Sequence, residues 1–182
     1  MAKKIGILIF VLILAGGGVF YWWNNQKDVR ELNKTLPEGV KVVKSLVGNE
    51  YKVVNKIDGY EFKVPKEWKG VKEVEYLMDK EQGANGISVK NLNGDMVGIG
   101  YYELSNEDKD LDSWVKEWSD RFKAFSWIIE KEKINNLDVV SVKEEKHLFE
   151  ISSFFFKKDF RIYEINGLSE EFLREIITNG RW

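Results

Sequence analysis

The single histidine and the absence of cysteine restrict the chemistry that this chain can carry out. Thiolate nucleophiles, thiolate zinc sites and iron–sulfur clusters all require cysteine, so these chemistries are excluded. His147 follows Glu144, Glu145 and Lys146, and no Ser–His–Asp arrangement is recognisable around it. We therefore interpret His147 as an ordinary surface or strand histidine. The sequence predicts no catalytic residue, no metal ligand and no cofactor.

Three closely spaced carboxylates, Asp108, Asp110 and Asp112, form a second group that could bind a cation. An EF-hand loop that begins at Asp108 needs glycine at its sixth position and glutamate at its twelfth. Ser113 and Ser119 stand at those positions instead. Because the cluster directly precedes an amphipathic stretch, we interpret it as the N-terminal cap of a helix.

Two further patterns are better explained by structure than by chemistry. Residues 97–101 contain two glycines but lack the third glycine and the following helix of a dinucleotide fingerprint. Lysines near Trp68 alternate with glutamates, which is typical of a solvated face (Lys63, Lys66, Lys69 and Lys72). The formal net charge of −2 gives no electrostatic reason to expect nucleic acid binding.

Hydrophobic periodicity predicts the elements that position these residues. An apolar stripe with helical spacing predicts a helix over residues 111–124. Ser169 is expected to cap a final helix that ends at Gly180. About eight short strands joined by tight turns account for most of the rest. The sequence therefore predicts an α+β domain over residues 51–182, with a mainly antiparallel sheet covered by helices. Residues 24–50 are expected to be a linker or stalk, with a short helix and a strand.

The uncharged segment at residues 5–23 predicts a membrane anchor. As a helix it would be about 28 Å long, close to the thickness of a hydrocarbon core. Lys3 and Lys4 precede it, and Tyr21, Trp22 and Trp23 follow as an interfacial aromatic belt. We expect a transmembrane helix within residues 1–23, a cytoplasmic N-terminus and an extracytoplasmic domain, with the lipid bilayer as a partner of residues 5–23. The alternative is a secretory signal cleaved near Ala15.

The segment Gly59–Trp68 resembles the Gly-aromatic-x-aromatic…Pro-x-x-Trp start of PsbP-like domains, through Tyr60, Phe62 and Pro65. That family includes the extrinsic photosystem subunit and its bacterial relatives, and uncharacterised bacterial anchored proteins are the nearer comparison. The later elements follow the same order as in that family: a helix at residues 113–118, a hairpin at 154–165 and a closing helix at 169–177. The resemblance implies an α-β-α sandwich over residues 51–182 that is used mostly for docking or assembly. Some family members bind metal ions, but no ligand motif carries over here.

These observations together predict a membrane-anchored, extracytoplasmic, non-enzymatic docking or assembly domain with a protein partner at the membrane surface. Exposed tryptophan is costly, so Trp68 and Trp182 are each expected either at the edge of the core or in an interface, and they are the candidate partner surface. Two alternatives stay open. One is a domain that binds a small ligand or a cation, and the other is a carboxylate-dependent hydrolase of envelope polymers.

Overall fold

The computed structural model describes residues 20–45, 48, 50–79, 84–104, 109–122, 124–146 and 151–182. Residues 20–25 are helical, and the elements that follow are two runs of consecutive strands, each preceded and followed by a helix. They are α2 (Lys27–Asn33), β1 (Val40–Lys44), β2 (Tyr51–Asn55), β3 (Tyr60–Lys63), β4 (Val71–Asp79), β5 (Ala84–Asn91), β6 (Met96–Glu103), α3 (Leu111–Arg121), β7 (Trp127–Ile134), β8 (Leu137–Glu144), β9 (Ser152–Lys158), β10 (Arg161–Gly167) and α4 (Glu170–Asn179).

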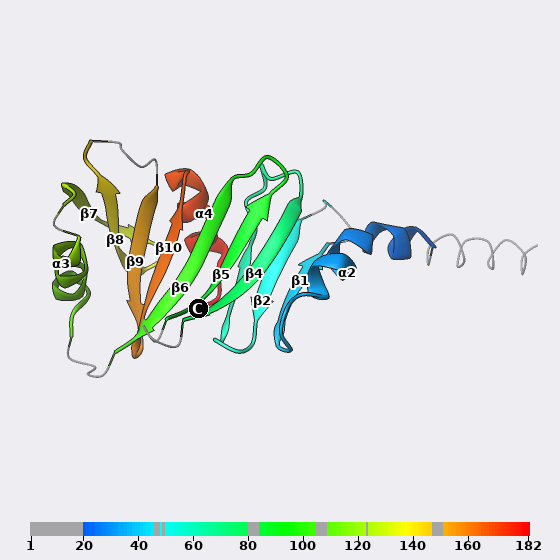
Figure 1. Cartoon of the computed structure of the whole chain (residues 1–182), viewed down its shortest axis with the longest axis horizontal. Coiled ribbons are helices and arrows are strands. Elements are labelled where there is room, and N and C mark those ends of the chain that lie inside the picture. The colour runs from blue at the N-terminus through cyan, green and yellow to red at the C-terminus, as the bar shows by residue number, and fades with distance from the viewer. Residues whose placement is uncertain are drawn as a thin grey trace, which may run out of the picture.

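The strands form two antiparallel sheets of unequal size (Figure 1). The large sheet has seven strands in the order β4-β5-β6-β10-β9-β8-β7. The small sheet has three strands in the order β1-β2-β3. Among the described residues, each pair of neighbouring strands in either sheet is antiparallel. Strands β4 and β7 are therefore the two edges of the large sheet, and β1 and β3 are the edges of the small one.

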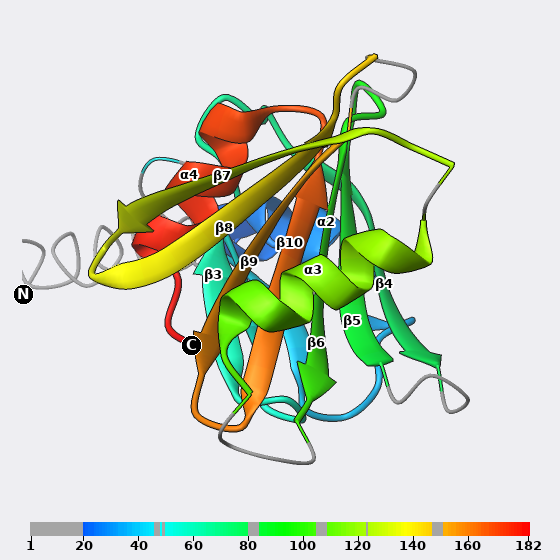
Figure 2. The ribbon, with the colours of Figure 1, turned by 90° about the vertical axis from the view of Figure 1, so that its left-hand side faces the viewer.

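The large sheet is the middle layer of the molecule, and its two faces are covered differently. The small sheet and α4 lie on one face, where α4 contacts β3, β10 and β7. Helix α3 lies across the other face and contacts β8 and β9 (Figure 2). Strand β9 shows why both faces are covered, because Phe154, Phe155 and Phe156 are consecutive and all fully buried. Phe154 and Phe156 belong to the core under the small sheet, and Phe155 belongs to the core under α3.

Both long helices begin where the sequence predicts a cap. The Asp110 carboxylate accepts a hydrogen bond from the backbone N–H of Ser113 at 2.8 Å, at the start of α3. Ser169 caps α4 in the same way through the N–H of Phe172. The predicted caps at Asp110 and Ser169 are thus confirmed, whereas Asp108 and His147 lie outside the described residues.

The predicted fold class is wrong. The described residues form a β-rich fold of ten strands in two antiparallel sheets, and not an α+β domain whose sheet is covered by helices. The error has a physical origin in the first three strands. Tyr60 and Phe62 on β3 point into the core, so the small sheet covers an area that helices were expected to cover. The segment predicted as a linker also contributes, because β1 pairs with β2, and Val29, Val40 and Val42 lie in the core.

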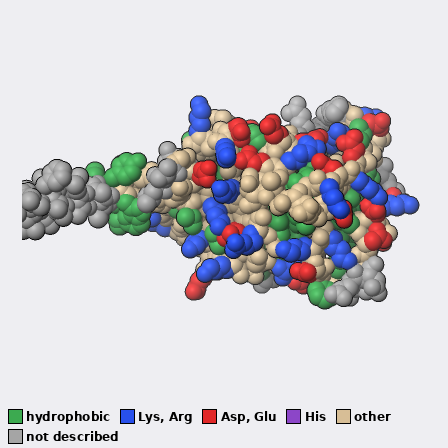
Figure 3. All heavy atoms as spheres, turned by 180° about the vertical axis from the view of Figure 1, so that it is seen from behind, with side chains coloured by type: hydrophobic (Ala, Val, Ile, Leu, Met, Phe, Trp, Pro, Cys, Tyr) green, Lys and Arg blue, Asp and Glu red, His purple; other side chains and the backbone are tan. Residues whose placement is uncertain are grey.

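The predictions about the membrane need correction as well. In the part of the chain that the structure describes, no helix has the length and apolar character needed to cross a membrane. This finding contradicts the predicted transmembrane helix and the predicted single-pass location in the cell membrane, and both predictions are withdrawn. Lys3, Lys4 and residues 5–19 lie outside the described residues. Tyr21, Trp22 and Trp23 are exposed, and hydrophobic side chains gather where the described chain begins (Figure 3).

Glycines on neighbouring strands provide a test of how closely the large sheet is packed. A Cβ atom added at Gly86 would lie 2.8 Å from the carbonyl oxygen of Ile99, which is fixed by the sheet. At Gly100 the nearest atom would be the Asn85 carbonyl oxygen at 3.5 Å, an ordinary contact. We predict that Gly86→Ala lowers the free energy of unfolding by roughly 1–3 kcal/mol in urea denaturation. Gly100→Ala is the matched control and should change it by less than about 0.5 kcal/mol. Equal effects would contradict this description of the packing.

Candidate functional site

A large groove lies between α2 and β4. Its volume is about 760 Å³. One wall comes from α2 and the residues after it, the other comes from β4, and Leu92 also lines the groove. The lining residues are Asp28, Glu31, Leu32, Thr35, Val71, Lys72, Glu73, Val74, Glu75, Tyr76, Leu77 and Leu92.

Strand β4 leaves one of its two backbone edges free along this groove. It pairs with β5 only, and no backbone hydrogen bond joins its outer edge to another described residue. The register shifts between Val71 and Glu73, so Lys72 occupies a β-bulge near the start of the strand. The rest of this strand of nine residues presents N–H and C=O groups that a further strand could pair with.

Two edges of the small sheet, in contrast, are closed by the chain itself. The Asn33 carboxamide bonds to the backbone of β1, donating to the Val42 carbonyl at 2.9 Å and accepting from the Val42 N–H at 2.7 Å. On β3, the N–H of Glu61 donates to the Arg181 carbonyl at 2.9 Å, and the Arg181 N–H donates to the Glu61 carbonyl at 2.7 Å. Among the described residues, the edges of the small sheet are therefore bonded to other parts of the chain, whereas β4 and β7 of the large sheet each end without a further backbone partner.

The side chains around the groove are mainly acidic at their charged positions. Asp28, Glu31, Glu73 and Glu75 line it, against the one ammonium group of Lys72. Asp28 is already paired with Lys44 at 3.1 Å, and Glu31 with Lys34 at 2.8 Å. Burial acts to raise the pKa of Asp28, but hydrogen bonds from Tyr51 and Lys44 outweigh it and hold this pKa below its ordinary value.

Glu73 and Glu75 differ from the other two acids because neither makes an ion pair with any described residue. Both are exposed, and they alternate along β4 with Val74, which is buried, and Tyr76, which is half-buried. Leu77 lies beyond them and is 55% exposed. The free edge thus has an acidic face formed by Glu73 and Glu75, and a more apolar face formed by Val74 and Tyr76.

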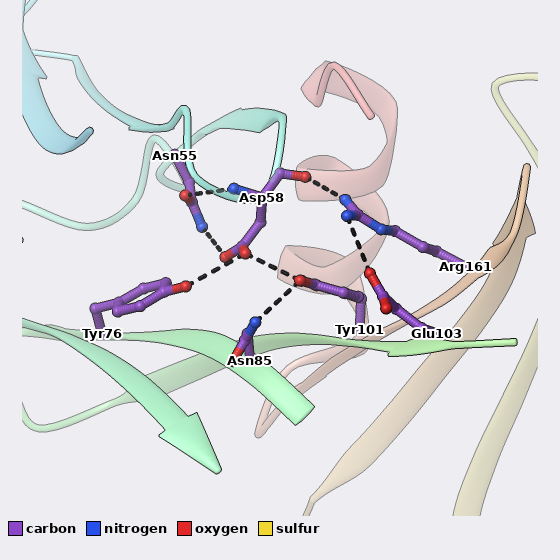
Figure 4. Close-up of polar contacts among 7 residues, drawn as sticks. All are labelled: Asn55, Asp58, Tyr76, Asn85, Tyr101, Glu103 and Arg161. Atoms are coloured by element: carbon purple, nitrogen blue, oxygen red, sulfur yellow. Dashed lines mark hydrogen bonds and ion pairs between the residues drawn. The ribbon is translucent and has the colours of Figure 1, made fainter. Parts of the chain in front are cut away.

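A buried polar cluster around Asp58 fixes Tyr76 in this wall (Figure 4). Asp58 lies in the turn between β2 and β3 and is only 2% exposed. Its carboxylate accepts hydrogen bonds from Asn55 Nδ2 at 2.5 Å, Tyr101 Oη at 3.1 Å and Tyr76 Oη at 3.3 Å. The turn is shaped by Asn55 Oδ1, which accepts from the N–H of Asp58 at 3.1 Å, and by Gly59 at φ +84°.

Arg161 and Asn85 complete the cluster. Arg161 Nη1 donates to the backbone carbonyl of Asp58 at 2.6 Å, and Nη2 lies 3.3 Å from the Glu103 carboxylate. Asn85 Nδ2 donates to Tyr101 Oη at 3.0 Å. A carboxylate beside two tyrosines and an arginine could act as an acid or a base, but Asp58 is enclosed and its oxygens are occupied. Its evident role is to hold the small sheet against β4, β5, β6 and β10.

The two tryptophans predicted as a partner surface do not lie in the groove. Trp68 is 6% exposed and packs edge-on against Phe172, with ring centroids 6.3 Å apart. Trp182 is half-buried, contacts the rings of Tyr60, Phe156 and Tyr163, and donates from Nε1 to the Ile177 carbonyl at 3.3 Å. The structure therefore places both side chains against the main core, at separate positions.

The residues that form the groove and its support were missed by the sequence analysis. Asp58 and Gly59 belong to one of the tight turns expected between strands, and Glu73 and Glu75 are among the glutamates that alternate with lysines near Trp68. The alternation of Glu73 and Glu75 with Val74 and Tyr76 is visible in the sequence. However, nothing in it shows that β4 is an edge strand, because strand order depends on pairing between distant segments.

The comparisons with known proteins are sparse. No family model matches the chain, and no curated protein matches it. One solved structure, from Bacteroides thetaiotaomicron, is similar over 67% of this chain with a TM-score of 0.41 and 11% sequence identity. The match covers 44% of that protein, so the present chain spans less than half of its length. A likeness this low supports no conclusion about fold or function, and the PsbP-like resemblance stays a prediction.

The Asp58 cluster predicts a large loss of stability when its acceptor is removed. Asp58→Ala leaves three donors without an acceptor, two of them in buried hydrogen bonds, so we expect the free energy of unfolding in urea to fall by about 3 kcal/mol. Asp138→Ala is the control, because the Asp138 side chain is 83% exposed. It should change stability by less than about 0.5 kcal/mol. A loss below about 1 kcal/mol for Asp58→Ala would show that the cluster is not a tie between the sheets.

Tyr76 makes the same cluster sensitive to alkaline pH. Burial and the negative charge of Asp58 raise the pKa of Tyr76 from 10.0 to about 12. A group whose pKa is higher in the folded state stabilises fully below its unfolded value and loses that contribution as pH rises through its folded value. Stability should therefore fall between pH 10 and about 12. In Tyr76→Phe this fall should be shallower, as measured by urea midpoints at successive pH values. Parallel pH profiles in the two proteins would refute the assignment.

Proposed function

We propose that this chain is a non-catalytic docking domain that binds an extended basic segment of a partner protein as an added strand on β4. The observation that carries the proposal is the free edge of β4 inside an acidic groove. Strand addition of this kind obtains affinity from main-chain hydrogen bonds, and it obtains specificity from side chains at alternate positions. Strand β4 offers free main-chain N–H and C=O groups for the first, and side chains that alternate between acidic and more apolar for the second.

The geometry of β4 also defines which peptide would fit. A strand paired with β4 would place every second side chain beside Glu73 and Glu75. The side chains between them would lie on the face of Val74 and Tyr76, where α2 supplies Leu32. The expected segment therefore alternates basic and apolar residues. Its basic side chains would neutralise two carboxylates that have no ion-pair partner among the described residues.

A comparison of β4 with β7, the other edge of the large sheet, separates charges that attract a partner from charges that only protect an edge. Charged side chains also protect edge strands from unwanted pairing, so their presence alone does not indicate binding. On β7, however, each charged side chain has a partner in the chain: Glu130 with Lys143, Lys131 with Asp112, Glu132 with Arg174, and Lys133 with Asp138. The β7 edge is electrostatically satisfied, whereas the acidic side chains of β4 are not.

The proposal predicts a selective interaction with a short synthetic peptide. A peptide of nine residues with alternating lysine and valine should bind the full-length chain, as measured by fluorescence anisotropy. Replacing its lysines by glutamate should abolish binding, because the charges would then repel. The backbone nitrogens of the peptide form two alternate sets, of which one faces β4. Methylating that set should weaken binding at least tenfold, since the main-chain hydrogen bonds would be lost.

Charge reversal in the protein provides the matched control. Glu73→Lys with Glu75→Lys should weaken binding of the lysine peptide at least tenfold. Glu130→Lys with Asp138→Lys makes the same change in net charge at the β7 end and should leave affinity within about twofold. If both double variants weaken binding equally, the attraction is a general charge effect and the proposed site is wrong.

A further inference from the structure

A second cavity lies on the opposite face of the large sheet, between the end of α3 and the strands beneath it. Its volume is about 300 Å³, at the lower end of the range for small-ligand pockets. It is separate from the groove at β4 and shares no residue with it. The lining residues are Trp118, Phe122, Trp127, Val142, Glu144, Ile151, Ser153, Glu164 and Asn166.

Three aromatic rings form an angled wall on one side of this cavity. Trp118 and Phe122 come from the end of α3, and Trp127 is the first residue of β7. The Trp118 ring lies 5.1 Å from that of Phe122 and 5.6 Å from that of Trp127, at interplanar angles of 55° and 54°. Phe155 and Phe125 pack against Trp118 and Trp127 from other directions, so the rings are held at fixed angles around the cavity.

Two carboxylates lie on the floor, from neighbouring parts of the sheet. Glu144, at the end of β8, is only 2% exposed. Glu164 of β10 accepts hydrogen bonds from Tyr102 Oη at 2.8 Å, Ser153 Oγ at 3.0 Å and Asn166 Nδ2 at 3.3 Å. These bonds hold the charge of Glu164 in place, and burial together with that charge raises the pKa of Tyr102.

We propose that this cavity binds an organic cation with a quaternary or methylated ammonium group. Such a group is attracted to the faces of tryptophan and phenylalanine rings, and its positive charge is offset by nearby carboxylates. Arg121 does not line this cavity; it lines a neighbouring hollow with Tyr102, which shares Trp118 and Phe122 with the aromatic wall.

Other classes of ligand fit the same side chains less well. Among the described residues, no group of three or more metal-ligating side chains gathers, so a bare metal ion would lack ligands here. A sugar would need hydrogen-bond donors as well as acceptors. The hydroxyl of Ser153 and the amide of Asn166 already donate to Glu164, which leaves the indole N–H of Trp127 as the buried lining donor without a hydrogen-bond partner among the described residues. A methylated ammonium needs neither donors nor a complete coordination shell.

The test is a titration of the full-length chain with choline chloride, followed by the indole N–H signals of its 7 tryptophans in NMR spectra. The signals of Trp118 and Trp127 should shift in a saturable manner, while that of buried Trp68 should not. The neutral isostere 3,3-dimethylbutan-1-ol should bind at least tenfold more weakly, and sodium chloride at equal ionic strength should cause no such shift. Absence of saturable shifts, or equal binding of the neutral alcohol, would overturn the proposal.

Variants locate the binding within the cavity. Glu144→Gln keeps the shape but removes a charge, and it should weaken choline binding at least tenfold. Phe122 is 44% exposed, so Phe122→Leu should fold normally and weaken binding about fivefold. The matched control is Phe160→Leu, at a side chain that is 54% exposed in the β9–β10 hairpin, and it should bind as the parent does. If Glu144→Gln does not fold, the comparison of Phe122→Leu with Phe160→Leu decides. Equal affinities in those two variants would refute the site.

Discussion

The buried carboxylate of Asp58 is the interaction on which the arrangement of the two sheets depends. It belongs to a turn of the small sheet, yet two of its three side-chain donors, Tyr76 and Tyr101, stand on strands of the large sheet. A charge that is 2% exposed must keep its hydrogen bonds, because an unpaired buried carboxylate is far more costly than an unpaired amide. The sheets therefore cannot slide or separate without leaving this group unsatisfied. Arg161, which donates to the backbone of the same residue, adds β10 to the set of strands that the turn holds.

The large sheet can be the middle layer because its central strands are apolar on both faces. The consecutive phenylalanines of β9 require cover on each side, and the chain supplies it with the small sheet and α4 on one side and α3 on the other. Neither layer covers its face of the large sheet completely. The small sheet and α2 leave the β4 edge free, and the end of α3 leaves the aromatic cavity around Trp118. Both candidate binding regions are thus places where one layer ends before the sheet does.

Local sequence signals predicted most elements but not their assembly. The stripe that begins at Leu111 predicted a helix to residue 124, and α3 occupies Leu111–Arg121, with Asp110 as its cap. Ser169 and the apolar face after it likewise predicted α4. The fold class failed because the pairing of β1 with β2, and the packing of their sheet on the large one, are long-range features that periodicity does not encode. Asp58 was missed for a related reason. A turn aspartate is ordinarily solvated, and only the approach of Tyr76 and Tyr101 from elsewhere in the chain makes it a buried centre.

The side-chain closure of β1 by Asn33 has a consequence for the stoichiometry of any complex. The carboxamide imitates a peptide group and occupies Val42, while the C-terminal residues at Arg181 occupy the far margin of the same sheet. Within the described residues, the small sheet therefore offers no second free edge to a partner strand, and the charged side chains of β7 are already paired within the chain. Assembly should stop after one partner strand per chain, in a discrete pair, and should not continue into an open-ended fibre.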